Sequence, residues 1–124
     1  MNLPKDPPAA KQMAEGLTRQ LNIAAQESLL SGTPFALGVS ERGYSLLTYD
    51  GTDWVTTDSR EWADDLEAKL TKNGESIKLT EEPLPHILFE PTGVSSVFAL
   101  SLSNFEASYS LLSLGDGRVA LEIE

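Results

Sequence analysis

The chain has 124 residues, enough for one folded domain, and its 40% hydrophobic content can supply a core. Nine Lys and Arg against 19 Asp and Glu give a net charge of −10, which argues against nucleic acid and anionic lipid as partners. The sequence has no cysteine and a single histidine, His86. It therefore excludes disulfides and thiolate chemistry and leaves one imidazole for zinc binding or nucleophilic catalysis.

The N-terminal third of the sequence predicts a leader followed by one long helix. Residues 1–8 are rich in proline and are expected to be extended. From residue 9 onward, apolar side chains recur at helical spacing until Gly32 and Pro34, so we predict a helix over about 9–31. Its apolar face comprises Ala10, Met13, Ala14, Leu17, Leu21, Ala24, Ala25 and Ser28.

The remainder, about 33–124, has the patterning of strands. The segment 59–74 is the exception, because Trp62, Leu66 and Leu70 recur every four residues, which predicts at least one helical turn that ends at Asn73-Gly74. The predicted strands are Phe35–Val39, Tyr44–Tyr49, Trp54–Thr57, Ile77–Leu79, His86–Phe89, Ser96–Leu102, Glu106–Leu112 and Val119–Ile123. One helix before a run of strands predicts an α+β fold, with the N-terminal helix packed on antiparallel β-sheets in a sandwich-like single domain over 9–124.

Three polar features of the sequence are candidate sites for chemistry. The segment 50–53 resembles part of a calcium loop but lacks the further oxygen ligands, so a hairpin turn is the preferred interpretation. An acidic cluster, predicted to lie on a solvated helix, comprises Glu61, Asp64, Asp65 and Glu67. His86 is interpreted as an edge residue of a strand or as a hydrogen-bonding residue at the boundary of the core. We therefore predict no catalytic residue, no cofactor-binding residue and no metal ligand.

The long helix leaves two alternatives open for its apolar side chains. Either the whole face packs on the strands of its own domain, or the first turns, 10–17, overhang the domain and dock on other subunits. A thin second stripe at Gly16, Ile23 and Leu30 supports docking. The candidate packing and assembly residues are Ala10, Met13, Ala14, Leu17, Leu21 and Ile23.

The order of motifs along the chain resembles the type IV pilin-like proteins, and specifically the minor pseudopilin H family of type II secretion, which includes FimT-like proteins. The helix end, from Leu17 to Ser31-Gly32, matches that of the family. So do the first hairpin with Gly43-Tyr44 and Trp54, and the last hairpin with Gly115-Asp116-Gly117. The central motif of an aromatic, Pro, Gly and a later Phe corresponds to Phe89, Pro91, Gly93 and Phe98.

The resemblance implies a pilin-like fold and a structural role without an active site. Such a protein is a minor subunit of the pseudopilus, assembles with major and minor pseudopilins through its N-terminal helix, and supports the export of folded proteins. The resemblance further implies a methylated, inner-membrane-anchored protein whose soluble domain lies in the periplasm. The family's apolar helical segment is expected upstream, with residues 1–8 including an artificial start.

Two other classes of function remain open at this stage. A soluble acidic binding module, such as a secretion chaperone, has the same size and charge but usually carries a second long helix near the C-terminus. A small-ligand-binding barrel or an enzyme would need a pocket with convergent polar groups.

The coding sequence upstream of Asn2 provides a direct test of the anchored form. We expect a Gly-Phe-Thr-x-x-Glu processing site followed by an apolar helix of about 20 residues. Sequencing of the gene checks this, and a native start codon at Met1 would contradict it.

Overall fold

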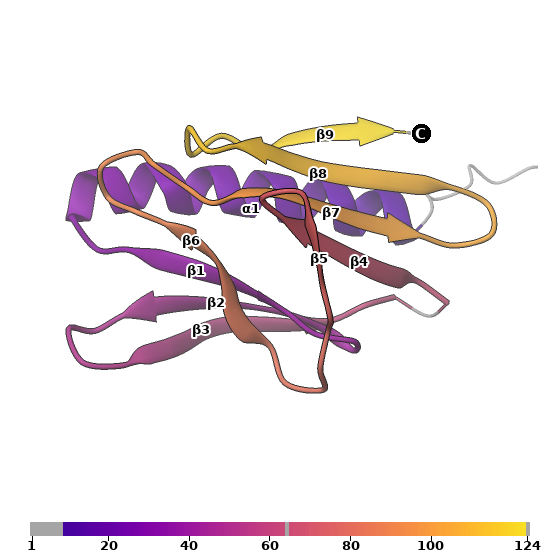
Figure 1. The fold of residues 1–124 in the computed structure, drawn as a ribbon, viewed down its shortest axis with the longest axis horizontal. Coiled ribbons are helices and arrows are strands. Elements are labelled where there is room, and N and C mark those ends of the chain that lie inside the picture. Colours follow the sequence, from indigo (N-terminus) through magenta and orange to yellow (C-terminus); the bar gives the residue numbers. More distant parts are fainter. Residues whose placement is uncertain (1–8, 64, 124) are drawn as a thin grey trace, which may run out of the picture.

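A computed structural model describes residues 9–63 and 65–123 of the chain, so the expected leader at 1–8 lies outside the described residues. One helix, α1 (Ala9–Ser31), is followed by strands only (Figure 1). The strands are β1 (Phe35–Val39), β2 (Gly43–Tyr49), β3 (Trp54–Glu61), β4 (Glu67–Lys72), β5 (Glu75–Ile77), β6 (Leu84–Phe89), β7 (Val97–Ser103), β8 (Ser108–Leu114) and β9 (Ala120–Ile123). The predicted α+β class, with one long N-terminal helix on antiparallel sheets, is confirmed.

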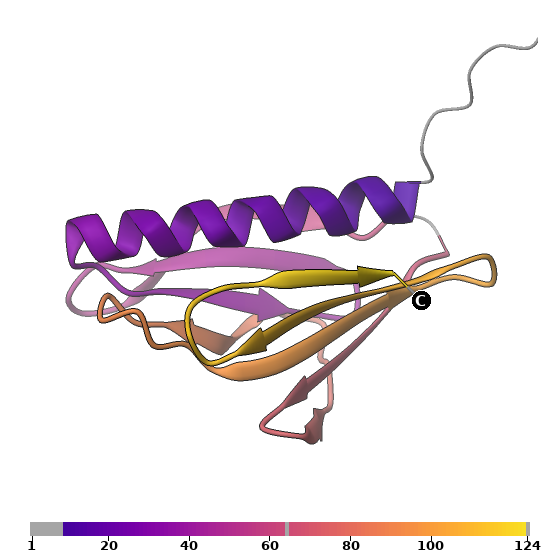
Figure 2. The ribbon, with the colours of Figure 1, turned by 90° about the horizontal axis from the view of Figure 1, so that it is seen from above.

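The strands form two sheets. The first has the order β3-β2-β1-β6 and the second β5-β4-β7-β8-β9, and every pairing within them is antiparallel. A single bridge between Phe89 and Ser95 joins the two sheets where the chain passes from β6 to β7. The helix α1 runs along both sheets, as the two views of the molecule show (Figures 1 and 2).

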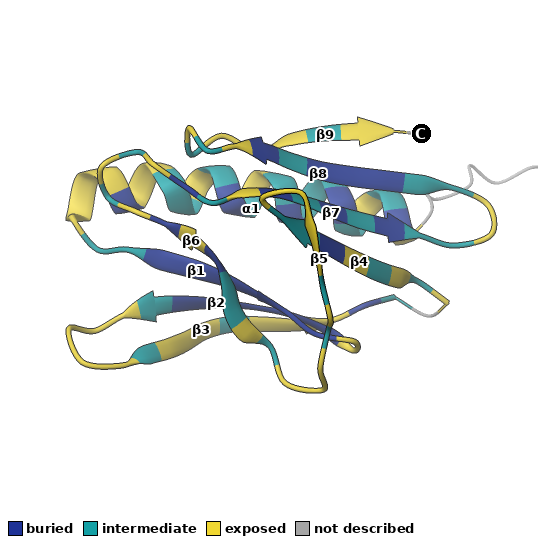
Figure 3. Ribbon diagram, in the orientation of Figure 1, coloured by how far each residue is buried: buried dark blue, intermediate teal, exposed yellow. Residues whose placement is uncertain are grey.

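The core lies between α1 and the inner faces of the two sheets (Figure 3). From α1, Leu17 and Leu21 are fully buried. Phe89 stacks on Phe35 with ring centroids 4.4 Å apart, and the Phe98 ring packs edge-on against Phe89 at 6.2 Å. Because Phe35 and Phe89 come from the first sheet and Phe98 from the second, this aromatic group holds the two sheets together.

Of the two alternatives for the apolar face of the helix, the structure shows packing on its own domain, and 10–17 does not overhang the domain. Ala10, Ala14 and Leu17 are at most 3% exposed, and they belong to the same core cluster as the strands. The reason lies in the C-terminal half of the chain, because β7, β8 and β9 extend alongside the first turns of α1 and cover them (Figure 2). A helix can precede every strand in the sequence and still be covered along its whole length.

The helical turn predicted within 59–74 is also wrong. Strand β3 continues to Glu61, and β4 occupies most of the remainder. Leu66, Ala68 and Leu70 face inward while Glu67 and Lys69 are exposed, so the period is two residues and belongs to a strand. Leu70 pairs with Leu100 in the second sheet, and Asn73-Gly74 forms the hairpin turn between β4 and β5.

Trp62 was the third member of the false helical pattern. Its side chain is buried, its indole Nε1–H donates to the carbonyl oxygen of Ser40 at 3.0 Å, and its ring packs on Tyr44. The Trp62 side chain therefore packs at one end of the first sheet and does not belong to the apolar face of a helix.

Strand β3 is an edge of the first sheet and carries an irregularity. Its pairing with β2 shifts register between Leu46 and Leu47, where β3 contains an extra residue. The strand's side chains are largely exposed and polar, with Asp58 and Arg60 beyond the bulge. Such a bulge twists an edge strand and interrupts its regular row of hydrogen-bonding groups.

A side-chain clamp joins α1 to the C-terminal part of the chain. The Asn22 Nδ2 donates to the carbonyl oxygen of Val119 at 2.9 Å, and the Val119 backbone N–H donates to Asn22 Oδ1 at 2.9 Å. Val119 is 5% exposed, so water cannot replace this pairing. The clamp fixes the chain as it enters β9.

We expect Asn22→Ala to lower the free energy of unfolding by about 1–3 kcal/mol, because it leaves both buried backbone groups of Val119 unpaired. Urea unfolding measures the change. Gln26→Ala, an exposed position on the same helix, is the matched control and should change stability by less than about 0.5 kcal/mol. Equal effects of the two substitutions would contradict the clamp.

Two glycines provide a second test. At Gly43 an added Cβ would overlap the backbone carbonyl of Arg60 in β3, whereas at Gly16 it would meet no atom within 4 Å. We expect Gly43→Ala to destabilise the protein by about 3 kcal/mol or more and Gly16→Ala to stabilise it by about 0.5–1 kcal/mol. Thermal unfolding of both variants checks the opposite signs.

Candidate functional site

One face of α1 is only partly covered by its own domain. Met13, Gly16, Gln20, Ile23 and Glu27 follow one another at spacings of three and four residues, which places them along a single stripe of the helix. We call these five residues the helix stripe. Ile23 at its centre is 51% exposed, and Gly16 has open space where a side chain would stand.

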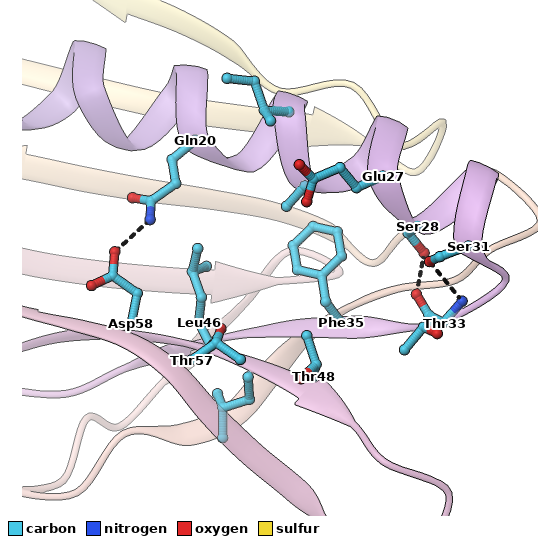
Figure 4. A pocket seen from close by; sticks show the side chains of 13 residues that line it. Gln20, Glu27, Ser28, Ser31, Thr33, Phe35, Leu46, Thr48, Thr57 and Asp58 are labelled. Carbon is cyan, nitrogen blue, oxygen red and sulfur yellow. Dashed lines mark hydrogen bonds between the residues drawn. The ribbon is translucent and has the colours of Figure 1, made fainter.

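The helix stripe forms one wall of two adjoining hollows. The first, of about 260 Å³, lies between the C-terminal half of α1 and strands β1–β3 (Figure 4). The second, of about 370 Å³, lies between the N-terminal half of α1 and the start of β2. Gln20 and Ile23 line both, so the two hollows form one groove along the helix.

Gln20 crosses this groove and ties the helix to the first sheet. Its Nε2 donates to Asp58 Oδ2 at 2.6 Å, and its Oε1 accepts a hydrogen bond from the Tyr44 hydroxyl at 3.3 Å (Figure 4 shows the first of these). Burial raises the pKa of Tyr44; the Arg60 charge opposes that rise and Asp58 adds to it. The tyrosine is thus a neutral hydrogen-bond donor at neutral pH.

The two ends of the groove carry opposite charges. Glu27 and Asp58 border the hollow at the C-terminal half of α1, and Arg19 and Arg60 border the other. The floor of the first hollow is apolar, with Phe35 and Leu46 on it. An apolar groove with charged residues of opposite sign at its two ends is more typical of a protein-binding surface than of an active site.

The six candidate packing and assembly residues separate into two groups in the structure. Four of them are buried in the core of this domain: Ala10, Ala14, Leu17 and Leu21. Met13 is partly buried against that core, and Ile23 is exposed. The expected second stripe is therefore visible as an uncovered face, since Leu30 is also 89% exposed.

The residues of the central sequence motif have distinct positions. Phe89 and Phe98 belong to the buried aromatic group. Pro91 and Gly93 lie outside the strands in the connection from β6 to β7, where Gly93 has a φ of 94°. Gly93 thus adopts a left-handed backbone conformation, which is unfavourable for residues that have a Cβ.

The segment 50–53 forms the preferred hairpin turn. Asp50 Oδ1 accepts hydrogen bonds from the backbone N–H groups of Asp53 and Thr52, each at 2.8 Å. These bonds lower the pKa of the Asp50 carboxyl. The Asp50 carboxylate therefore stabilises the turn through hydrogen bonds to its backbone N–H groups.

The other polar features assemble no reactive centre among the described residues. Asp64, from the acidic cluster, lies outside the described residues. Glu61 ends β3, Asp65 lies between the strands and Glu67 begins β4, so the predicted helix for this cluster is wrong. Burial lowers the pKa of His86, and the positive charge of Lys72 acts in the same direction. Across 9–63 and 65–123, no three His, Cys, Asp or Glu side chains are grouped to hold a metal ion. Over the same ranges, no helix is long and apolar enough to cross a bilayer.

Sequence reasoning missed the wall opposite the helix stripe. Tyr44 was placed in a strand, but Asp58 and Arg60 fell at or beyond the end of the predicted third strand. Their approach to Gln20 depends on the register of β3 against β2, in which Tyr44 pairs with Arg60 and Leu46 with Asp58. No local pattern in the sequence marks this long-range pairing.

Comparisons with known proteins give a consistent result. The sequence model of the family described as "Type II transport protein GspH" matches residues 13–120. Two structures of the minor pseudopilin EpsH from the type II secretion system of Vibrio cholerae are similar at 19% identity. Their TM-scores are 0.78 and 0.77, covering 92% and 91% of this chain and 95% and 92% of theirs. The solution structure of E. coli GspH is similar at 18% identity and a TM-score of 0.71, covering 93% of this chain and 88% of that one. No curated protein matches the sequence.

The family match spans most of the described chain, and the structural similarities cover both sheets and the helix. The resemblance read from the motif order is confirmed, and the chain belongs to the GspH family of type II transport proteins, the minor pseudopilins of the type II secretion system.

Proposed function

We propose that the chain acts as a structural subunit of the type II secretion pseudopilus and packs against a neighbouring subunit through the helix stripe. The observation that carries this proposal is the exposed part of α1 beside its buried face: Ile23 is 51% exposed, whereas Leu17 and Leu21 are fully buried. Membership of the GspH family supports this proposal, because it makes the chain a minor pseudopilin of the type II secretion system.

The helix stripe has the features of a helix-packing surface. Its three-and-four spacing presents a continuous ridge, and Gly16 lets another backbone approach closely. The Gln20 bridge holds the helix at a fixed distance from the first sheet, so the groove is formed before a partner arrives. Preorganisation of this kind reduces the cost of association.

The same proposal includes the location of the protein. A helix that continues upstream of α1 would leave the domain at the N-terminal end of α1, which lies opposite the turn from β8 to β9 (Figure 2). That direction suits an inner-membrane anchor with this domain in the periplasm, and the acidic surface keeps the domain soluble there. Major and minor pseudopilins are the partners that fit.

A secretion chaperone was the alternative, and it would have a second long helix near the C-terminus. Among the described residues, that end of the chain forms β8 and β9. No contact in the described structure favours the chaperone over the pseudopilin.

We expect Ile23→Glu to leave the stability of this domain within about 0.5 kcal/mol of the parent, because the side chain is exposed. In the full-length protein, the buried carboxylate that assembly would create should reduce type II secretion about tenfold or more. Secretion of a native exoprotein in a strain lacking the chromosomal gene, complemented by each variant, measures the effect.

Gln26→Glu is the matched control, because it adds the same charge at an exposed position of α1 that lines neither hollow. It should secrete like the parent. Met13→Glu should act like Ile23→Glu on secretion, with a larger loss of stability because Met13 packs partly on the core. Full secretion by the Ile23→Glu variant, at a normal protein level, would overturn the proposed role of the helix stripe.

A further inference from the structure

His86, the single histidine of the chain, lies in the first half of β6. The residue as a whole is partly buried, but its Nε2 atom is closed off from solvent and has no hydrogen-bond partner among the described residues. A neutral imidazole tolerates this position, because one of its two ring nitrogens carries no proton. An imidazolium carries a proton on both nitrogens, so protonation would leave a buried N–H group and a positive charge without an acceptor.

The charges around His86 also oppose protonation. Burial lowers the pKa of His86, and the positive charge of Lys72 in β4 lowers it further. Strand β1, the pairing partner of β6, contains no ionisable side chain. None of the carboxylates on the adjoining segments forms a hydrogen bond with the buried Nε2 atom to offset the Lys72 charge. The ionisable side chains of those segments are Glu75, Lys78, Glu81, Glu82 and Glu90.

The segment that carries His86 is attached to the first sheet by irregular backbone contacts. We call residues 78–86 the His86 segment; it passes from the second sheet to the edge of the first (Figure 1). Pro83 and Pro85 have no backbone N–H to donate. The pairing of β6 with β1 also shifts register between Leu37 and Val39. The His86 segment therefore lacks the regular pairing of the second half of β6.

Two contacts hold the His86 segment against the first sheet. The Glu41 backbone N–H, in the turn from β1 to β2, donates to the Thr80 carbonyl oxygen at 2.9 Å. Farther along, the carbonyl oxygens of Pro83 and Leu84 lie so close to Gly38 of β1 that a Cβ there would be 3.0 Å and 2.9 Å from them. A glycine at position 38 thus permits close packing of the two backbones.

We propose that the His86 segment is an acid-sensitive strap on the first sheet. It lies against β1 and the turn from β1 to β2 while the imidazole is neutral, and it detaches when the imidazole takes up a proton and turns toward water. The strap concerns the folding of this domain alone. It is independent of the helix stripe and of the proposed function, so either proposal can fail without the other.

The direction of the pH dependence follows from where the proton binds. Above about pH 6.5, the ordinary pKa of histidine, the imidazole is neutral whether the segment is attached or detached. Below that value, a detached segment takes up a proton more readily than an attached one, because its imidazole is hydrated and lies farther from Lys72. Acid therefore favours detachment, and the segment is held most firmly above about pH 6.5.

Amide hydrogen exchange at Glu41 tests the proposal, because detachment releases that N–H from Thr80. NMR measures the protection factor, which corrects for the intrinsic exchange rate, between about pH 7.5 and about pH 5 in the chain without a histidine tag. We expect the Glu41 protection factor to fall at least about threefold. The Ser96 N–H, which donates to the Leu88 carbonyl oxygen at 2.9 Å beside the second half of β6, is the internal control and should keep its protection.

Three substitutions identify the groups involved, and a fourth mimics the detached state. His86→Gln removes the titrating group and should abolish the pH dependence of Glu41 exchange. Lys72→Met should weaken that dependence. Lys69→Met, on the other face of β4, is the matched control and should leave it unchanged. Gly38→Ala should lower Glu41 protection at every pH, because the added Cβ would displace the His86 segment.

The native chain also provides a test that needs no substitution. Because the chain contains one histidine, the imidazole Cε1–H resonance reports the titration of His86 alone. We expect its midpoint in the folded chain to lie below that of the chain in urea. A midpoint at or above the unfolded value would overturn the strap. So would a Glu41 protection factor that does not change with pH, or an equal loss of protection at Ser96, which would indicate unfolding of the whole domain.

Discussion

The structure depends on the burial of one face of α1 between two sheets. Neither sheet encloses a core alone, because each has its inner face directed at the helix and at the other sheet. Leu17 and Leu21 contribute no exposed surface, and burying side chains of this size is worth about 1.5–3 kcal/mol each. The two hydrogen bonds between Asn22 and the Val119 backbone fix the position of the chain that enters β9 relative to the helix. The aromatic group and the Phe89–Ser95 bridge also join the two sheets directly.

Much of this arrangement could be predicted from local patterns. The helix was predicted correctly because the apolar spacing is regular and because Gly32, followed by Pro34, is a typical C-terminal stop; in the structure Gly32 has the positive φ of such a cap. The meander of β1 to β3 followed from short breaks containing glycine. The segment 59–74 failed because Trp62, Leu66 and Leu70 fit a helix as well as Leu66, Ala68 and Leu70 fit a strand. Pairing with β7 settles the choice, and such pairing is a long-range contact that no window of sequence contains.

The candidate site was predictable only in part, and for the same reason. Gly16, Ile23 and Leu30 stood out as a second stripe because helical geometry alone relates them. Whether a stripe faces solvent depends on strands that arrive much later in the chain. The first turns of α1 are covered by the C-terminal strands, which removed Ala10, Ala14 and Leu17 from any exposed surface. The opposite wall, with Asp58 and Arg60, depends on the register of an edge strand. Residues of a packing surface can therefore be predicted from the sequence only where a single helix or strand contains all of them.

The bulge in β3 bears on how the edge of the first sheet avoids pairing with strands of other chains. A regular edge strand offers a template to any other chain, and growth by strand addition has no natural end. Here the extra residue in β3 breaks the ladder, and Asp58 and Arg60 place charges beside the break. At this edge of the first sheet, the irregular strand and its charged side chains disfavour the addition of another strand.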